Sequence, residues 1–167
     1  MNLYVLRHGE AARLGEGVRR DADRPLTPGG AADATLVGTA LARLDPGISL
    51  LLCSPFTRAR QTAEAVAARF PVSPAVRETE NLSPGFRPKA LIAELQGIPP
   101  GDSVVIVGHQ PDLGAFMAYV IDGESPASIA LPPAALAHIR FDTDAMSDAT
   151  LRWLLVPDVL TTLLSPR

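Results

Sequence analysis

Short apolar runs alternate with longer stretches of helical periodicity along most of the chain. Three runs are too short for helices and are bounded by charged or turn-forming residues, which indicates buried strands at residues 2–6, 48–53 and 104–107. A weaker strand candidate at residues 72–76 is interrupted by Pro74. These runs predict at least three strands that lie deep in a sheet.

Helix starts follow the strands. Thr27 suits an N-cap and Pro28 the first helical position, and Ser54-Pro55 repeats this pair after the second strand. Pro111 is placed in the same way after the third strand. The apolar spacing then predicts helices over residues 28–44, 55–67, 88–95 and 111–121. Residues 9–26 have no sustained period and predict an exposed loop.

The C-terminal part predicts two strands, at residues 135–141 and 150–156, paired antiparallel across the polar link 142–149. A last short helix is expected over residues 157–164. Strands that alternate with helices favour a mostly parallel sheet covered on both faces. We therefore expect an α/β fold.

The composition fits one soluble domain spanning residues 1–167, because 47 % of the residues are hydrophobic and 20 % are charged. A net charge of −3 argues against general nucleic-acid binding. Cys53 is the only cysteine, so it excludes an intramolecular disulfide and fits a small buried hydrophobe. Neither a signal peptide nor an apolar run of about 20 residues is recognisable, so we expect a cytoplasmic protein off the membrane.

Arginines and histidines stand where three strands are predicted to end. Arg7 and His8 follow the first strand, Arg58 lies one turn into the helix after the second, and His109 follows the third. In open α/β sheets ligands bind beyond the carboxyl ends of the strands, so these side chains converge if the strands are neighbours. Arginine pairs with phosphate oxygens, and a neutral imidazole is a competent nucleophile toward phosphorus. The pattern favours a phosphoryl site, and Gly9 would let the backbone approach the ligand closely.

Four segments resemble the histidine phosphatase superfamily, in the family's own order. They are Leu6-Arg7-His8-Gly9, Arg24-Pro25-Leu26-Thr27-Pro28-Gly29-Gly30, Ser54-Pro55-Phe56-Thr57-Arg58-Ala59-Arg60-Gln61-Thr62-Ala63 and Val107-Gly108-His109. The second is similar to the family's "RPLT..G" element and the third to its "S...RA.QTA" element, an alignment that selects Arg58 over Arg60. The resemblance implies a three-layer α/β/α sandwich with a mostly parallel central sheet, like that of phosphoglycerate mutases.

The resemblance also implies the roles at the site. His8 would attack phosphorus and become phosphorylated, while Arg7, Arg58 and His109 hold the phosphoryl oxygens. Water would then hydrolyse the phosphohistidine. Neither a metal nor another cofactor is implied.

Within the superfamily the likeness is greatest to the small SixA-type phosphohistidine phosphatases, in length and in the stretch Glu80-Asn81-Leu82-Ser83-Pro84. Larger members carry an acidic proton donor, for which this chain offers Glu78 and Glu80, outside any clear family motif. A phosphohistidine substrate needs such an acid less, because imidazole leaves more readily than an alkoxide. The predicted partner is a phosphohistidine-bearing protein. This chain itself is expected to be a monomer or a weak oligomer.

Other functions remain open at this point. A phosphomonoesterase of the same superfamily would act on a small phosphorylated substrate and use Glu78 or Glu80 as the acid. A metallohydrolase with His8 and His109 as ligands is disfavoured by the fixed positive charges of Arg7 and Arg58. A phosphate-binding adaptor without turnover would keep the same residues.

Two further features have weaker functional interpretations. His138 lies in a predicted strand and outside every motif, so a structural role is favoured. Four arginines in the loop before the first helix suit either a solvated segment or the steering of an acidic phosphoprotein toward His8: Arg13, Arg19, Arg20 and Arg24.

Overall fold

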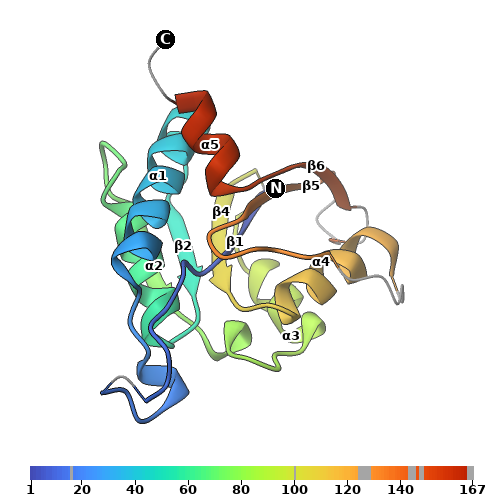
Figure 1. Ribbon diagram of the computed structural model, residues 1–167. Helices are drawn as coiled ribbons and strands as arrows, with labels where there is room; N and C mark the ends of the chain where they lie inside the picture. The colour runs from blue at the N-terminus through green and yellow to red at the C-terminus, as the bar shows by residue number, and fades with distance from the viewer. Residues whose placement is uncertain (16, 100, 124–128, 143–145, 147–148, 165–167) are drawn as a thin grey trace.

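The computed structural model describes residues 1–167 except 16, 100, 124–128, 143–145, 147–148 and 165–167. The described chain forms one six-stranded sheet in the order β3-β2-β4-β1-β5-β6, with helices on both faces (Figure 1). The strands are β1 (Asn2–Arg7), β2 (Leu50–Cys53), β3 (Ala75–Glu78), β4 (Ser103–Gly108), β5 (Leu136–Phe141) and β6 (Ala149–Leu155). The α-helices are α1 (Pro28–Leu44), α2 (Thr57–Ala67), α3 (Pro88–Leu95), α4 (Asp112–Asp122) and α5 (Pro157–Leu164). Short 3-10 helices form at η1 (Asp21–Asp23) and η2 (Glu80–Leu82), and no described helix is long and apolar enough to cross a membrane.

The sheet is mixed, with a parallel half and an antiparallel edge. Strands β3, β2, β4 and β1 run parallel, whereas β5 pairs antiparallel with both β1 and β6. Helices α1 and α2 lie on one face of the sheet, and α3 and α4 on the other (Figure 1). The predicted three-layer α/β/α fold is confirmed.

Alternation along the central strands divides the core into two parts. In β4, Val104 and Ile106 pack toward α3 and α4, while Val105 and Val107 pack toward α1 and α2. Every residue of β4 is buried, as expected for a strand covered on both faces. Strands β1, β2 and β4 each pack against both parts of the core. Their ends therefore have little freedom to move.

The register aligns the carboxyl ends of these three strands. Arg7 at the end of β1 pairs with Gly108 at the end of β4, and Cys53 at the end of β2 pairs with Val107. His8 and His109 are therefore the next residues after two neighbouring strands. Hydrogen-bonded strands of a sheet lie about 4.8 Å apart. This alignment places the candidate residues at one edge.

The predicted starts of β2, α2 and β3 are wrong by two or three residues, and β2 begins at Leu50 rather than at Ile48. Helix α2 begins at Thr57 rather than at Pro55, because the Ser54 hydroxyl accepts the Phe56 N–H in a turn that precedes the helix. The weak strand at residues 72–76 forms instead at Ala75–Glu78, after Pro74, whose missing N–H is unsuited to pairing. The antiparallel pairing of the last two strands is confirmed, although most of the link between them lies outside the described residues.

Candidate active site

His8 lies directly beyond β1, and its side chain is 8 % exposed. Its Nδ1 is 2.7 Å from the carbonyl oxygen of Gly9. A carbonyl oxygen can only accept, so Nδ1 carries the ring proton and Nε2 keeps its lone pair. The bond to Gly9 thus selects the tautomer in which Nε2 is the nucleophilic atom.

Arg58 faces that lone pair. Its Nε donates to His8 Nε2 over 3.1 Å, and its guanidinium carbon lies 5.0 Å from the centre of the Phe56 ring. Its Nη1 donates to the carbonyl oxygen of Asp21 at 2.7 Å, and Nη2 pairs with Asp21 Oδ2 at 2.9 Å. The Arg58 side chain is 6 % exposed, so a buried cation stands directly against the candidate nucleophile.

His109 approaches His8 from the neighbouring strand. The two ring centres are 5.1 Å apart, and His109 Nε2 lies 2.8 Å from the Ser54 hydroxyl. The Ser54 hydroxyl has one proton and two lone pairs, so it can donate to Nε2 while it accepts the Phe56 N–H, and the ring proton of His109 then resides on Nδ1. Among the described residues Nδ1 is buried without a hydrogen-bond partner, so in this tautomer it is a donor available to an anionic oxygen.

Arg7 supplies a second unmet donor. Its Nη1 donates to the carbonyl oxygen of Leu131 at 2.7 Å, whereas its buried Nε has no hydrogen-bond partner within the described part of the chain. The Arg7 charge lowers the pKa of both His8 and His109. Buried donors without partners are rare in folded proteins, and these two belong to residues at the ends of the neighbouring strands β1 and β4.

The electrostatics keep both imidazoles neutral. Burial, the largest cause, lowers the pKa of His8 to about 4; the Gly9 bond raises it, and the charges of Arg58 and Arg7 lower it. Burial and then His8 and Arg58 lower the pKa of His109 to about 3. At neutral pH the site therefore combines an uncharged nucleophile with fixed cations, an arrangement suited to attack on a phosphoryl group.

Comparison with known proteins agrees with this geometry. The family model of the histidine phosphatase superfamily (branch 1) matches residues 3–83, which include three of the four motif segments. An uncharacterised protein of Picosynechococcus is 36 % identical over 142 residues, covering 84 % of this chain and 85 % of the relative. The chain belongs to the histidine phosphatase superfamily.

SixA proteins are similar to this histidine phosphatase over almost its whole length. The phosphohistidine phosphatase SixA of Escherichia coli is 28 % identical over 159 residues and is covered to 94 %, as is this chain. The solved structure of the protein histidine phosphatase SixA complexed with tungstate superposes with a TM-score of 0.80 at 28 % identity. The match covers 96 % of this chain and 99 % of that one. This histidine phosphatase is thus SixA-like in sequence and in fold.

One face of α2 ties the loop of residues 9–26 to the site. Gln61 Oε1 accepts the Leu26 N–H at 2.8 Å, and Thr62 Oγ1 accepts the Gly9 N–H at 3.1 Å. With Arg58, these residues are spaced three and four apart and share a helix face. The "RA.QTA" element of the sequence therefore serves the loop as well as the phosphoryl site.

Gly9 has a structural role that the sequence did not predict. Its N–H is already donated to Thr62 and its carbonyl oxygen holds His8. A Cβ on Gly9 would lie 2.5 Å from the carbonyl oxygen of Gly30, so the close approach that requires glycine is to α1. A direct contact between Gly9 and a phosphoryl group stays a prediction.

Asp21 is the site residue that the sequence did not reveal. It lies in a loop without periodicity, 37 residues from Arg58, and both its carbonyl and its carboxylate bind that arginine. Its Oδ1 also accepts from Arg24 Nη1 at 2.9 Å. Only the buried position of Arg58, a cation in need of a counter-charge, could have suggested such a residue.

The two candidate acids, Glu78 and Glu80, are bonded to residues other than those of the candidate site. Glu78 ends β3, which is separated from β1 by the two strands β2 and β4, and lies 3.6 Å from Arg60. Glu80 begins η2 and accepts the Ser83 hydroxyl at 2.7 Å. Within the described part of the chain, neither carboxylate forms a hydrogen bond or ion pair with His8, Arg58 or His109.

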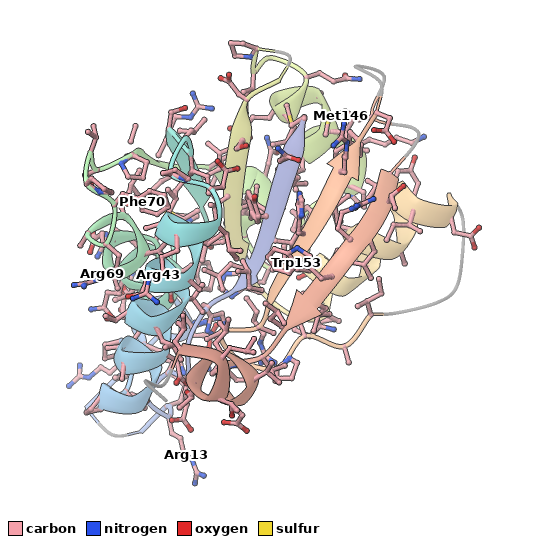
Figure 2. The ribbon with its side chains drawn as sticks, turned by 90° about the horizontal axis from the view of Figure 1, so that it is seen from above. Arg13, Arg43, Arg69, Phe70, Met146 and Trp153 are labelled. Atoms are coloured by element: carbon pink, nitrogen blue, oxygen red, sulfur yellow. The ribbon has the colours of Figure 1, made fainter. Side chains whose placement is uncertain are left out.

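The loop arginines divide into two pairs. Arg20 and Arg24 are engaged with Asp23 and Asp21 respectively. Arg13 and Arg19 are exposed, and Figure 2 shows Arg13 extending from the loop into solvent. The steering of an acidic phosphoprotein stays a prediction, and it now depends on two arginines rather than four.

Proposed function

We propose that this histidine phosphatase removes phosphoryl groups from phosphohistidine side chains of proteins, through a phosphorylated His8. The observation that carries the proposal is the hydrogen bond from His8 Nδ1 to Gly9, which keeps the ring's lone pair on Nε2, the atom that faces Arg58. The likeness to SixA proteins, named phosphohistidine phosphatases, supports the substrate class.

The reaction has two displacements. In the first, His8 Nε2 attacks phosphorus, a P–N bond to His8 forms, and the P–N bond to the substrate imidazole breaks. In the second, water attacks phosphorus, the bond to His8 breaks, and inorganic phosphate leaves. A covalent intermediate of this kind replaces one difficult step by two easier ones.

Three side chains stabilise the phosphoryl group in flight. Once the phosphoryl group is on His8 Nε2, the Arg58 Nε donor that faced this nitrogen faces a phosphoryl oxygen instead, without turning the guanidinium, and Arg7 Nε and His109 Nδ1 donate to further oxygens. In comparable sites, loss of one such donor costs roughly 3 kcal/mol of transition-state stabilisation.

Leaving-group chemistry favours phosphohistidine over an alkyl phosphate. An imidazole can be protonated before it departs, whereas an alkoxide needs a general acid within hydrogen-bond reach. Among the described residues, Glu78 pairs with Arg60 and Glu80 accepts from the Ser83 hydroxyl, so each carboxylate would have to leave a partner to serve a leaving atom. This arrangement supports a substrate whose leaving group needs little assistance.

The experiment measures phosphate release from a phosphohistidine-bearing protein and from an aryl phosphate, each in excess EDTA. We expect the wild-type protein to turn over both, and His8→Ala to turn over neither. His138→Ala is the matched control, because the third histidine lies in β5 and stacks on Tyr4, outside the site. Glu78→Gln and Glu80→Gln should change phosphohistidine turnover by less than about twofold.

Each contrary outcome has a definite meaning. Full activity of His8→Ala would refute the nucleophile. Activity on the aryl ester alone, with a sharp loss in either glutamate variant, would make the protein a small-molecule phosphomonoesterase. Activity that disappears in EDTA and returns with a metal ion would refute metal independence. Binding of phosphate without any turnover would indicate an adaptor.

A further inference from the structure

Asp21 contacts Arg58 at two points from the loop between β1 and α1. Its carbonyl oxygen accepts from Nη1 at 2.7 Å and its Oδ2 from Nη2 at 2.9 Å. Both terminal nitrogens of the guanidinium are therefore held by one residue, while Nε is left to face His8. Because the guanidinium is planar, fixing two nitrogens fixes the direction of the third.

Asp21 is itself held in place. Its second carboxylate oxygen pairs with Arg24 Nη1 at 2.9 Å, and Arg24 in turn donates to the carbonyl oxygens of Ala11 and Ala12. The Arg58 contacts are thus anchored to the backbone of the loop that follows His8. An isolated carboxylate on a loop would lack this stiffness.

We infer that Asp21 is a positioning residue for phosphoryl transfer, which orients Arg58 so that its Nε donor meets the group in flight between His8 and the leaving atom. The inference rests on the proposed function, because it requires His8 to be the nucleophile and Arg58 a donor to the phosphoryl oxygens. Asp21 does not touch the phosphoryl group and acts only through Arg58. Its effect should therefore fall on kcat more than on KM.

The loop offers a closely matched control. Asp23 lies two residues away, its side chain is 46 % exposed against 45 % for Asp21, and it also pairs with an arginine. Its partner is Arg20, a surface residue that is 77 % exposed and that, among the described residues, forms no hydrogen bond or ion pair with His8, Arg58 or His109. Exposure is nearly the same and the charge is the same in the two positions, so a difference between them reports the contacts of Asp21 with Arg58 and Arg24.

The test measures kcat and KM for an aryl phosphate in Asp21→Ala, Asp21→Asn and Asp23→Asn. We expect Asp21→Ala to lower kcat by about tenfold to a hundredfold. This loss is smaller than the one expected when a donor to the phosphoryl oxygens is removed altogether. Asp21→Asn keeps an acceptor for Nη2 and should recover most of this loss, whereas Asp23→Asn should stay within about twofold of wild type. Thermal unfolding of each variant separates loss of folded protein from loss of rate.

A double-mutant cycle decides whether the effect passes through Arg58. In an Arg58→Lys background the two-point contact cannot form, so Asp21→Ala should change the rate by less than about twofold. An equal loss in both backgrounds, or a wild-type kcat in Asp21→Ala, would overturn the inference. For variants whose turnover is too slow to measure, the same cycle compares their affinities for tungstate, measured by calorimetry.

The two proposals fail in different ways. If His8→Ala keeps its activity, the proposed nucleophile is wrong and with it the role of Asp21. If His8→Ala is inactive while Asp21→Ala behaves like Asp23→Asn, only the positioning role is refuted.

Discussion

His8 owes its tautomer and its charge state to separate neighbours. The Gly9 carbonyl fixes the proton on Nδ1, while burial keeps the ring neutral. Arg58 and Arg7 add to this effect, since a second positive charge beside them is unfavourable. The cations that we propose as ligands of the phosphoryl oxygens therefore also help to keep His8 unprotonated.

The activity should consequently persist to unusually low pH. Protonated His8 cannot attack, and its pKa lies near 4 rather than at 6.5. We expect kcat/KM, corrected for ionisation of the substrate, to stay level from pH 8 to about 6 and to fall with a midpoint near 4. A midpoint close to 6.5 would contradict the buried, arginine-flanked environment of the ring.

The free energy of unfolding also depends on pH, separately from the protonation of His8 in the folded protein. The pKa of both site histidines is lowered in the folded state, so the unfolded chain binds more protons once the pH drops below about 6.5. The associated stability is present above pH 6.5 and is lost as the pH falls toward 4. Activity regained after return to pH 7, together with circular dichroism at each pH, distinguishes protonation of His8 from unfolding.

At the scale of elements, the first turn of α1 packs against the backbone that follows β1. A Cβ on Gly30 would lie 2.2 Å from the carbonyl oxygen of Glu10 and 2.6 Å from its nitrogen. Backbone atoms cannot yield as a flexible side chain can, so this contact fixes the chain two residues after His8. The glycine of the "RPLT..G" element is explained by this approach.

Gly30→Ala and Gly29→Ala test the contact as a pair. A Cβ on Gly29 would meet only side-chain oxygens, at 3.8 and 3.9 Å. We expect Gly30→Ala to lower the free energy of unfolding by about 1–3 kcal/mol and to reduce kcat/KM. Gly29→Ala should be neutral or stabilising by up to about 1 kcal/mol, because alanine favours the helix. Equal behaviour of the two variants in urea unfolding would refute the proposed contact.

The sequence predicted those elements that carry their own local signals. Thr27 accepts the Gly30 N–H as the expected N-cap, and α3 and α5 span the predicted residues. The predicted helix start was wrong at Ser54, where a turn forms in place of the first helical residues. The Ser54 hydroxyl hydrogen-bonds the Phe56 N–H and the His109 ring. Such a choice depends on a neighbouring strand, which no local pattern contains.

At the scale of the whole molecule, strand order decides whether the site exists. The sequence placed Arg7, His8, Arg58 and His109 at strand ends, but it could not show that β4 lies between β1 and β2. Asp21 was missed for the same reason, since its contact with Arg58 joins two segments 37 residues apart. Long-range pairing of this kind follows from the packing of both cores together, not from any single segment.

The C-terminal helix contributes to stability at a distance from the chemistry. Leu160 of α5 is 3 % exposed and packs in the core beneath α1, near Ala40 and Leu44, whereas Leu163 is 67 % exposed. The last turn of α1 is about 20 Å from Gly30 at its first turn, since the helix rises 1.5 Å per residue. Figure 1 shows α5 lying beside α1.

Leu160→Ala should therefore destabilise the protein without changing its catalysis. We expect a loss of about 2–5 kcal/mol in the free energy of unfolding, because a buried leucine leaves a cavity. Leu163→Ala on the same helix should cost less than about 0.5 kcal/mol. Urea unfolding gives both values, and kcat/KM per folded molecule should match wild type in each. A catalytic loss in Leu160→Ala that exceeds its unfolded fraction would mean that packing of α5 is transmitted along α1 to the turn that holds His8.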